Sequence, residues 1–131
     1  ILESIAFEYL SYVEILRSVG IELKRVIGTG GGSKGRFWNQ IKADILNAPY
    51  VTLERTEGAV LGNALLAAYG IGDIKDLKKT VREWVKVKDT FAPRKTQNET
   101  YRRIYETREQ ILNGPLYEIF EKLAALHSQA R

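Results

Sequence analysis

Residues 23–46 read LKRVIGTGGGSKGRFWNQIKADIL, and this stretch decides the fold class. Residues 23–27 are a short apolar run that predicts a buried strand. Residues 28–35 are rich in glycine and predict a loop, because such a segment fits neither a helix nor a strand. A helix is predicted at residues 36–46, and a second strand at residues 50–53. The apolar side of the helix at residues 36–46 is formed by Phe37, Trp38, Ile41, Ile45 and Leu46. A strand, a loop, a helix and a strand in this order predict a parallel α/β unit.

The glycine loop is the strongest indication of a binding site. Three consecutive glycines, Gly30 to Gly32, remove side chains that would keep a ligand from the backbone. Successive backbone N–H groups and the start of the following helix can then bind an anion. Lys34 and Arg36 add positive charge. The loop therefore predicts a phosphate-bearing ligand, and the alternative is a tight turn that binds nothing.

Two known phosphate-binding patterns can be compared with this loop. The Walker pattern requires glycine before the lysine and Ser or Thr after it, whereas Ser33 precedes Lys34 and Gly35 follows it. The dinucleotide pattern G-x-G-x-x-G is satisfied by Gly30, Gly32 and Gly35, and Glu54 ends the next strand, where an acid would bind a ribose. A nicotinamide-dinucleotide-binding domain is therefore an alternative. The predicted helix before the first strand, and the helices after the second, argue against it.

The rest of the chain reads as helices. They are predicted at residues 2–18, 57–69, 77–85, 96–112 and 116–126, with Gly20 ending the first, Thr56 capping the second and Asn113-Gly114-Pro115 separating the last two. We expect one helix-rich domain over residues 1–131. The first helix opens without a cap or a methionine, which suggests a chain cut from a longer protein.

Composition limits the remaining classes of function. The 131 residues include no cysteine and one histidine, His127, so thiolate and histidine-based chemistry are disfavoured. The net charge of +4 leaves a non-enzymatic basic interaction module as an alternative, with Lys79 and Arg82 as its contacts. Nucleic acid and membrane are not expected partners. Asp44, Glu54, Glu57 and Asp73 are interpreted as solvated charges and helix caps.

Three segments carry a resemblance to a known family. Residues 30–46 (GGGSKGRFWNQIKADIL) and 57–68 (EGAVLGNALLAA) resemble the adenine-nucleotide loop and the small-residue helix of the FGGY carbohydrate kinases. Residues 1–7 (ILESIAF) resemble the helix that follows a signature of that family. Pro93, Tyr101 and Tyr105 fit its C-terminal tail, which is most similar to that of xylulokinases.

The resemblance implies part of the second domain of the actin-like (ribonuclease H-like) ATPase fold, an α/β fold. ATP or ADP would bind at Gly30, Gly31 and Gly32 near its α-phosphate. The adenosine would lie near Ser33, Gly35 and Asn39.

The resemblance also implies what this chain lacks. The catalytic aspartate, the sugar-binding residues and most Mg²⁺-binding residues would lie upstream of Ile1. The parent protein would be a cytoplasmic ATP-dependent kinase that phosphorylates a sugar, D-xylulose, and this chain alone would be inactive. A homodimer is also expected, because half of a cleft exposes apolar surface.

Overall fold

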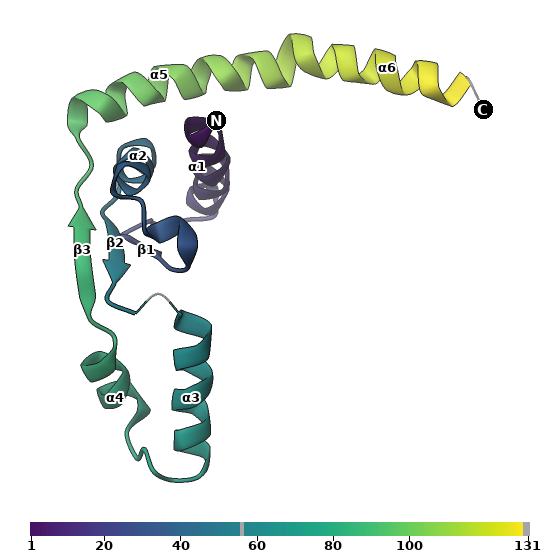
Figure 1. The fold of residues 1–131 in the computed structure, drawn as a ribbon. Coiled ribbons are helices and arrows are strands. Elements are labelled where there is room, and N and C mark those ends of the chain that lie inside the picture. The colour runs from purple at the N-terminus through teal and green to yellow at the C-terminus, as the bar shows by residue number, and fades with distance from the viewer. Residues whose placement is uncertain (56, 130–131) are drawn as a thin grey trace.

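The computed structural model describes residues 1–55 and 57–129, with side chains up to residue 126 (Figure 1). In chain order the elements are α1 (Leu2–Ser18), β1 (Val26–Gly28), η1 (Gly31–Ser33), α2 (Arg36–Leu46), β2 (Tyr50–Leu53), α3 (Gly58–Gly70), α4 (Leu77–Trp84), β3 (Val87–Phe91), α5 (Lys95–Ile111), η2 (Leu112–Leu116) and α6 (Tyr117–Gln129). The expected bounds of α1, α2 and β2 are confirmed. Thr56 and the side chain of His127 lie outside the described residues.

The three strands form one sheet in the order β1-β2-β3. β1 pairs with β2 in parallel, with Val26 opposite Tyr50, which confirms the predicted parallel unit. β1 is shorter and later than predicted, and its central residue Ile27 is exposed rather than buried. Side chains alternate between the two faces of a strand, and the face that carries Ile27 stays open in the described part of the chain.

The third strand, β3, contradicts the prediction that only helices follow β2. It pairs with β2 in the antiparallel sense, with Phe91 opposite Tyr50. Its sequence VKDTF is mostly polar and exposed, so it lacks the apolar run by which β1 and β2 were predicted. An antiparallel third strand also differs from the parallel sheet that a dinucleotide-binding domain would continue.

The core lies where α1, α2 and α5 meet. Its buried residues are Ala6, Phe7, Leu10, Val13, Ile41, Ile45, Leu46 and Tyr105. A smaller cluster of Ala43, Tyr50 and Phe91 joins α2 to the sheet. Gly20 ends α1 in the left-handed conformation as predicted, with a φ of 82°, and the N–H of Ile21 donates to the carbonyl of Leu16 at 3.0 Å, as in a Schellman motif.

The segment between β2 and β3 forms the α3–α4 hairpin, which extends from one end of the sheet (Figure 1). α4 is capped by Asp76, whose side chain accepts a hydrogen bond from the N–H of Lys79 at 3.0 Å. In the sequence, Leu77, Val81, Trp84 and Val85 form an amphipathic stripe that predicts core packing of Trp84, but Trp84 is 44% exposed at the end of α4.

α5 and α6 form a long rod that projects beyond the rest of the molecule (Figure 1). The predicted break at Asn113-Gly114-Pro115 appears as the short π-helical segment η2, in which Gly114 has a non-helical φ of −122° and ψ of −108°. Across the described helices, none is both long enough and apolar enough to cross a membrane.

Candidate nucleotide-binding site

The glycine loop contains a single 3-10 turn, η1, whereas the sequence predicted a loop without regular structure. Gly30 precedes the turn with a φ of 68°, a conformation that favours glycine. The turn is closed by the N–H of Ser33, which donates to the Gly30 carbonyl at 3.2 Å. The hydrogen bonds of the turn are donated by the N–H groups of Ser33 and Lys34, so those of Gly31 and Gly32 have no acceptor within it. They are therefore available to an anion outside the loop.

Gly31 and Gly32 are not required by the packing of the chain. A Cβ atom added at either residue would meet no atom within 4 Å, and neither residue has a positive φ. Any side chain there would project into open space next to the turn. This arrangement is what a ligand needs in order to reach the backbone.

Ser33 and Asn39 support the turn from inside. Ser33 is 4% exposed and its hydroxyl donates to the Gly30 carbonyl at 2.8 Å. Asn39 is 1% exposed and its Nδ2 donates to the Ser33 carbonyl at 2.7 Å. The Oδ1 atom of Asn39 is buried without a partner among the described residues. The role of both residues near an adenosine stays a prediction.

Gly35 is the N-cap of α2, with a φ of −83°. It provides no side chain to cap the helix, so the first-turn N–H groups have no capping side-chain partner and keep the positive end of the helix dipole available. Phe37, which was predicted on the buried side of this helix, is 75% exposed, while Trp38 packs against the core.

A polar pocket of about 530 Å³ opens next to the loop, between the start of α2 and the strands β2 and β3. It is lined by Ser33, Lys34, Arg36, Asn39, Thr52, Leu53, Glu54, Lys88 and Asp89. Arg36 forms an ion pair with Asp89 at 2.9 Å. Ser33 and Asn39, two of the predicted site residues, are thus brought together with Glu54 and with Lys88, which sequence reasoning missed because β3 was not predicted.

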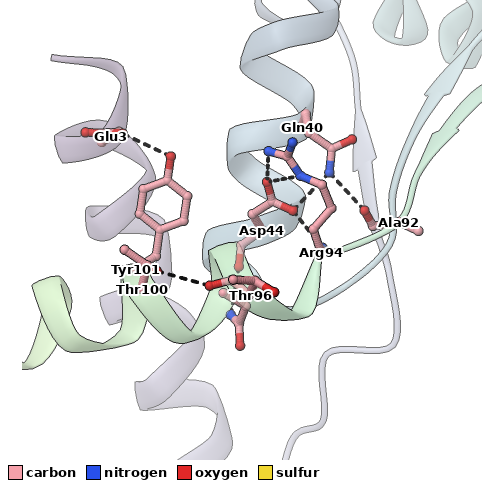
Figure 2. Close-up of polar contacts among 9 residues, drawn as sticks. Glu3, Gln40, Asp44, Ala92, Arg94, Thr96, Thr100 and Tyr101 are labelled. Atoms are coloured by element: carbon pink, nitrogen blue, oxygen red, sulfur yellow. Dashed lines mark hydrogen bonds and ion pairs between the residues drawn. The ribbon is translucent and has the colours of Figure 1, made fainter.

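Asp44 is a buried residue, which corrects its interpretation as a solvated charge. Its side chain is fully buried, and Figure 2 shows how it joins α2 to the start of α5. Oδ2 accepts from Nη2 of Arg94 at 2.6 Å and from Nε at 3.0 Å, and Oδ1 accepts from the Arg94 backbone N–H at 2.8 Å. This contact raises the pKa of Arg94 above its usual value, chiefly through the hydrogen bonds to the carboxylate.

The acidic residues do not form a metal site within the described residues. No group of three or more His, Asp or Glu side chains there is placed to hold a metal ion. Asp44 is committed to Arg94, and Glu54 lines the pocket next to the loop.

Lys42 is a further residue near the loop that sequence reasoning missed. It is 4% exposed, and its Nζ donates to the carbonyl of Gly32 at 3.3 Å. A signal was present, because Lys42 lies four residues after Trp38 and four before Leu46, on the apolar side of α2.

Comparison with known proteins identifies the class to which this fold and loop belong. The family description "FGGY family of carbohydrate kinases, C-terminal domain" matches residues 1–71, and the chain belongs to this family. The fold is accordingly part of the actin-like ATPase fold of sugar kinases.

Individual relatives agree with this assignment. Xylulose kinase of Staphylococcus epidermidis is 35% identical over 111 residues, which cover 85% of this chain and 22% of that protein. Glycerol kinase 1 of Clostridium tetani is 35% identical over 86% of this chain and 21% of its own length. The crystal structure of xylulose kinase from Rhodospirillum rubrum superposes with a TM-score of 0.74 at 29% identity, over 92% of this chain and 24% of that one. The chain therefore spans less than a quarter of the length of these relatives.

Proposed function

We propose that this chain forms the ATP-binding part of a kinase that transfers the γ-phosphate of ATP to a hydroxyl group of a sugar, D-xylulose. The observation that carries the proposal is the turn at Gly31 and Gly32. Its backbone is open to a ligand, its glycines are not needed for packing, and it lies within the segment that the family shares. The family's own description as carbohydrate kinases supports the reaction class.

In this proposal the N–H groups at Gly30, Gly31 and Gly32 bind the nucleotide near its α-phosphate. Ser33 and Asn39 keep the turn in shape, and the adenosine lies near Ser33, Gly35 and Asn39. The unpartnered Oδ1 of Asn39 supports this placement, because a buried acceptor is costly until a donor reaches it. Lys34, which lines the adjacent pocket, adds a positive charge that favours an anionic ligand.

The remaining functions of the kinase belong to the rest of the protein. Phosphoryl transfer needs a base for the attacking hydroxyl, a metal ion for the phosphate charge and a site for the acceptor. We propose that these groups, the sugar site and most ligands of Mg²⁺ included, come from the longer part that the relatives have and this chain lacks.

The proposal is tested by calorimetric titration of ADP, ATP and NADH into the purified chain. We expect ADP and ATP to bind with dissociation constants in the high micromolar to millimolar range, because only one wall of the cleft is present. NADH should bind more weakly, since the antiparallel β3 does not provide a dinucleotide-binding sheet. A preference for NADH over ADP would overturn the proposal.

The purified chain is expected to have no sugar kinase activity. In a coupled assay with ATP, Mg²⁺ and D-xylulose, the rate of ADP formation should equal that without protein, because in this proposal the base and the sugar site belong to the longer part that the relatives have. The full-length protein, assayed in parallel with D-xylulose and with glycerol, is the control and identifies the acceptor. Phosphorylation of D-xylulose by the purified chain would contradict this expectation.

A further inference from the structure

Lys42 lies directly behind the glycine turn. Its Nζ donates to the hydroxyl oxygen of Tyr50 at 2.6 Å and to the Gly32 carbonyl at 3.3 Å. The ammonium group also lies 4.0 Å from the ring centroid of Tyr50 and 4.9 Å from that of Trp38. One side chain of α2 therefore connects the turn to the start of β2.

The position of Tyr50 depends on a glycine in β1. A Cβ atom at Gly28 would lie 2.2 Å from the hydroxyl oxygen of Tyr50, so a side chain there would displace the ring. Gly28 thus leaves room for Tyr50, whose hydroxyl accepts from Lys42, and Lys42 in turn donates to the Gly32 carbonyl.

The charge on Lys42 has no counter-ion in the described part of the chain. None of the ion pairs found there includes Lys42, and its two hydrogen-bond acceptors are a neutral hydroxyl and a carbonyl. Burial of an unpaired cation is costly. The same burial lowers the pKa of Lys42 from 10.5 to about 8, so the group is mostly charged at neutral pH.

We propose that Lys42 is a positioning residue for the nucleotide: its buried ammonium holds the Gly32 carbonyl and places a positive charge behind the turn that receives the phosphate. The inference rests on the proposed function. It explains why a cation remains in a site that an apolar residue would fill at lower cost. The phosphate is then the missing counter-ion, and its binding favours the protonated amine.

The other titratable groups near Lys42 lie on β2, α1, the turn, α5 and β3. Tyr50 from β2 faces it directly, and burial, followed by the influence of Tyr9 from α1, raises the pKa of Tyr50, so its hydroxyl stays neutral. Lys34 follows the turn at its exposed edge. On the sides of α2 that face α5 and β3, Arg94 is held by Asp44 and Asp89 is paired with Arg36. Among these groups of the described residues, Lys42 is the buried cation that has no counter-ion.

The sign of the pH effect follows from the two states. Binding raises the pKa of Lys42 above its value of about 8 in the free chain, so ADP affinity is full below that value and falls as the pH rises through it. For a shift of about one unit, affinity falls about tenfold between about pH 7.5 and about pH 9.5. The phosphate groups of ADP are already ionised over that interval.

The test compares Lys42→Met and Lys34→Met with the unchanged chain. Calorimetry measures ADP affinity at several pH values in that interval, and thermal unfolding measures stability. We expect Lys42→Met to bind ADP about tenfold more weakly at about pH 7.5, with no fall in affinity at higher pH. Its melting temperature should be unchanged or higher, because a buried charge is removed. Lys34→Met should keep the pH-dependent fall of the unchanged chain.

A second measurement does not depend on a variant. The side-chain amine of Lys42, followed by NMR with ¹⁵N-labelled lysine, should titrate at a higher pH when ADP is present. ADP binding that Lys42→Met leaves equally strong and equally pH-dependent would overturn the inference and leave the proposed function intact. Absence of ADP binding to the unchanged chain would instead overturn the proposed function, and this inference with it.

Discussion

Asp44→Ala is expected to lower the free energy of unfolding by about 3 kcal/mol, the largest stability effect that we predict for a single substitution. The carboxylate is fully buried and accepts hydrogen bonds from Gln40 and from the backbone and guanidinium of Arg94. Its removal leaves the Arg94 N–H without an acceptor and opens a cavity between α2 and α5. Urea unfolding, followed by circular dichroism, measures the loss.

The matched control for this substitution is Asp89→Ala. Asp89 also forms an ion pair with an arginine, Arg36, but that pair is at the surface, with side chains 31% and 73% exposed. Exposed pairs contribute about 0.5 kcal/mol or less. If Asp44→Ala and Asp89→Ala lower the free energy of unfolding by the same amount, the buried contact is not what attaches α5 to α2.

Gly31→Val is expected to reduce ADP affinity by about a hundredfold, or beyond detection, without loss of stability. The branched side chain would occupy the open space next to the turn and keep a phosphate from the backbone N–H groups. Each lost hydrogen bond to a charged phosphate costs about 1.5 kcal/mol, so the loss of two accounts for this factor. The fold should tolerate the change, because Gly31 has no positive φ and a Cβ there meets no atom within 4 Å.

Gly70→Val provides the control for this prediction. Gly70 is the last residue of α3, a helix that extends away from the sheet in Figure 1, and a Cβ there also meets no atom within 4 Å. ADP titration and thermal unfolding of both variants separate an effect on the site from a general effect of the larger side chain. Undiminished ADP binding by Gly31→Val would place the nucleotide elsewhere.

The sequence predicted the elements that local residue patterns determine. The limits of α2 follow from Gly35 before it and from Asn47 after it, which adopts the left-handed conformation with a φ of 50°. The end of α1 follows in the same way from Gly20. These signals are local, so no knowledge of the tertiary structure was needed to place them.

What the sequence did not predict depends on contacts between distant segments. β3 is mostly polar and becomes a strand because it pairs with β2. Asp44 is of a residue type that is usually exposed, and its burial is possible because Arg94, fifty residues later, pairs with its carboxylate. Lys42 was likewise missed as a buried charge. For β3 and Asp44 the partner lies on another element, outside the window in which periodicity can be detected, whereas Lys42 lies on the apolar side of α2 in the sequence itself.

The Asp44–Arg94 contact also bears on evolution and engineering. The family description matches residues 1–71, yet the buried carboxylate of this segment is neutralised by Arg94, and its core includes Phe91 and Tyr105. The matched segment therefore takes part of its core, and the partner of its buried carboxylate, from residues beyond 71. Chimeras between relatives should exchange it together with the tail through Tyr105, because a crossover near residue 71 would separate Asp44 from the Arg94 with which it pairs in this chain.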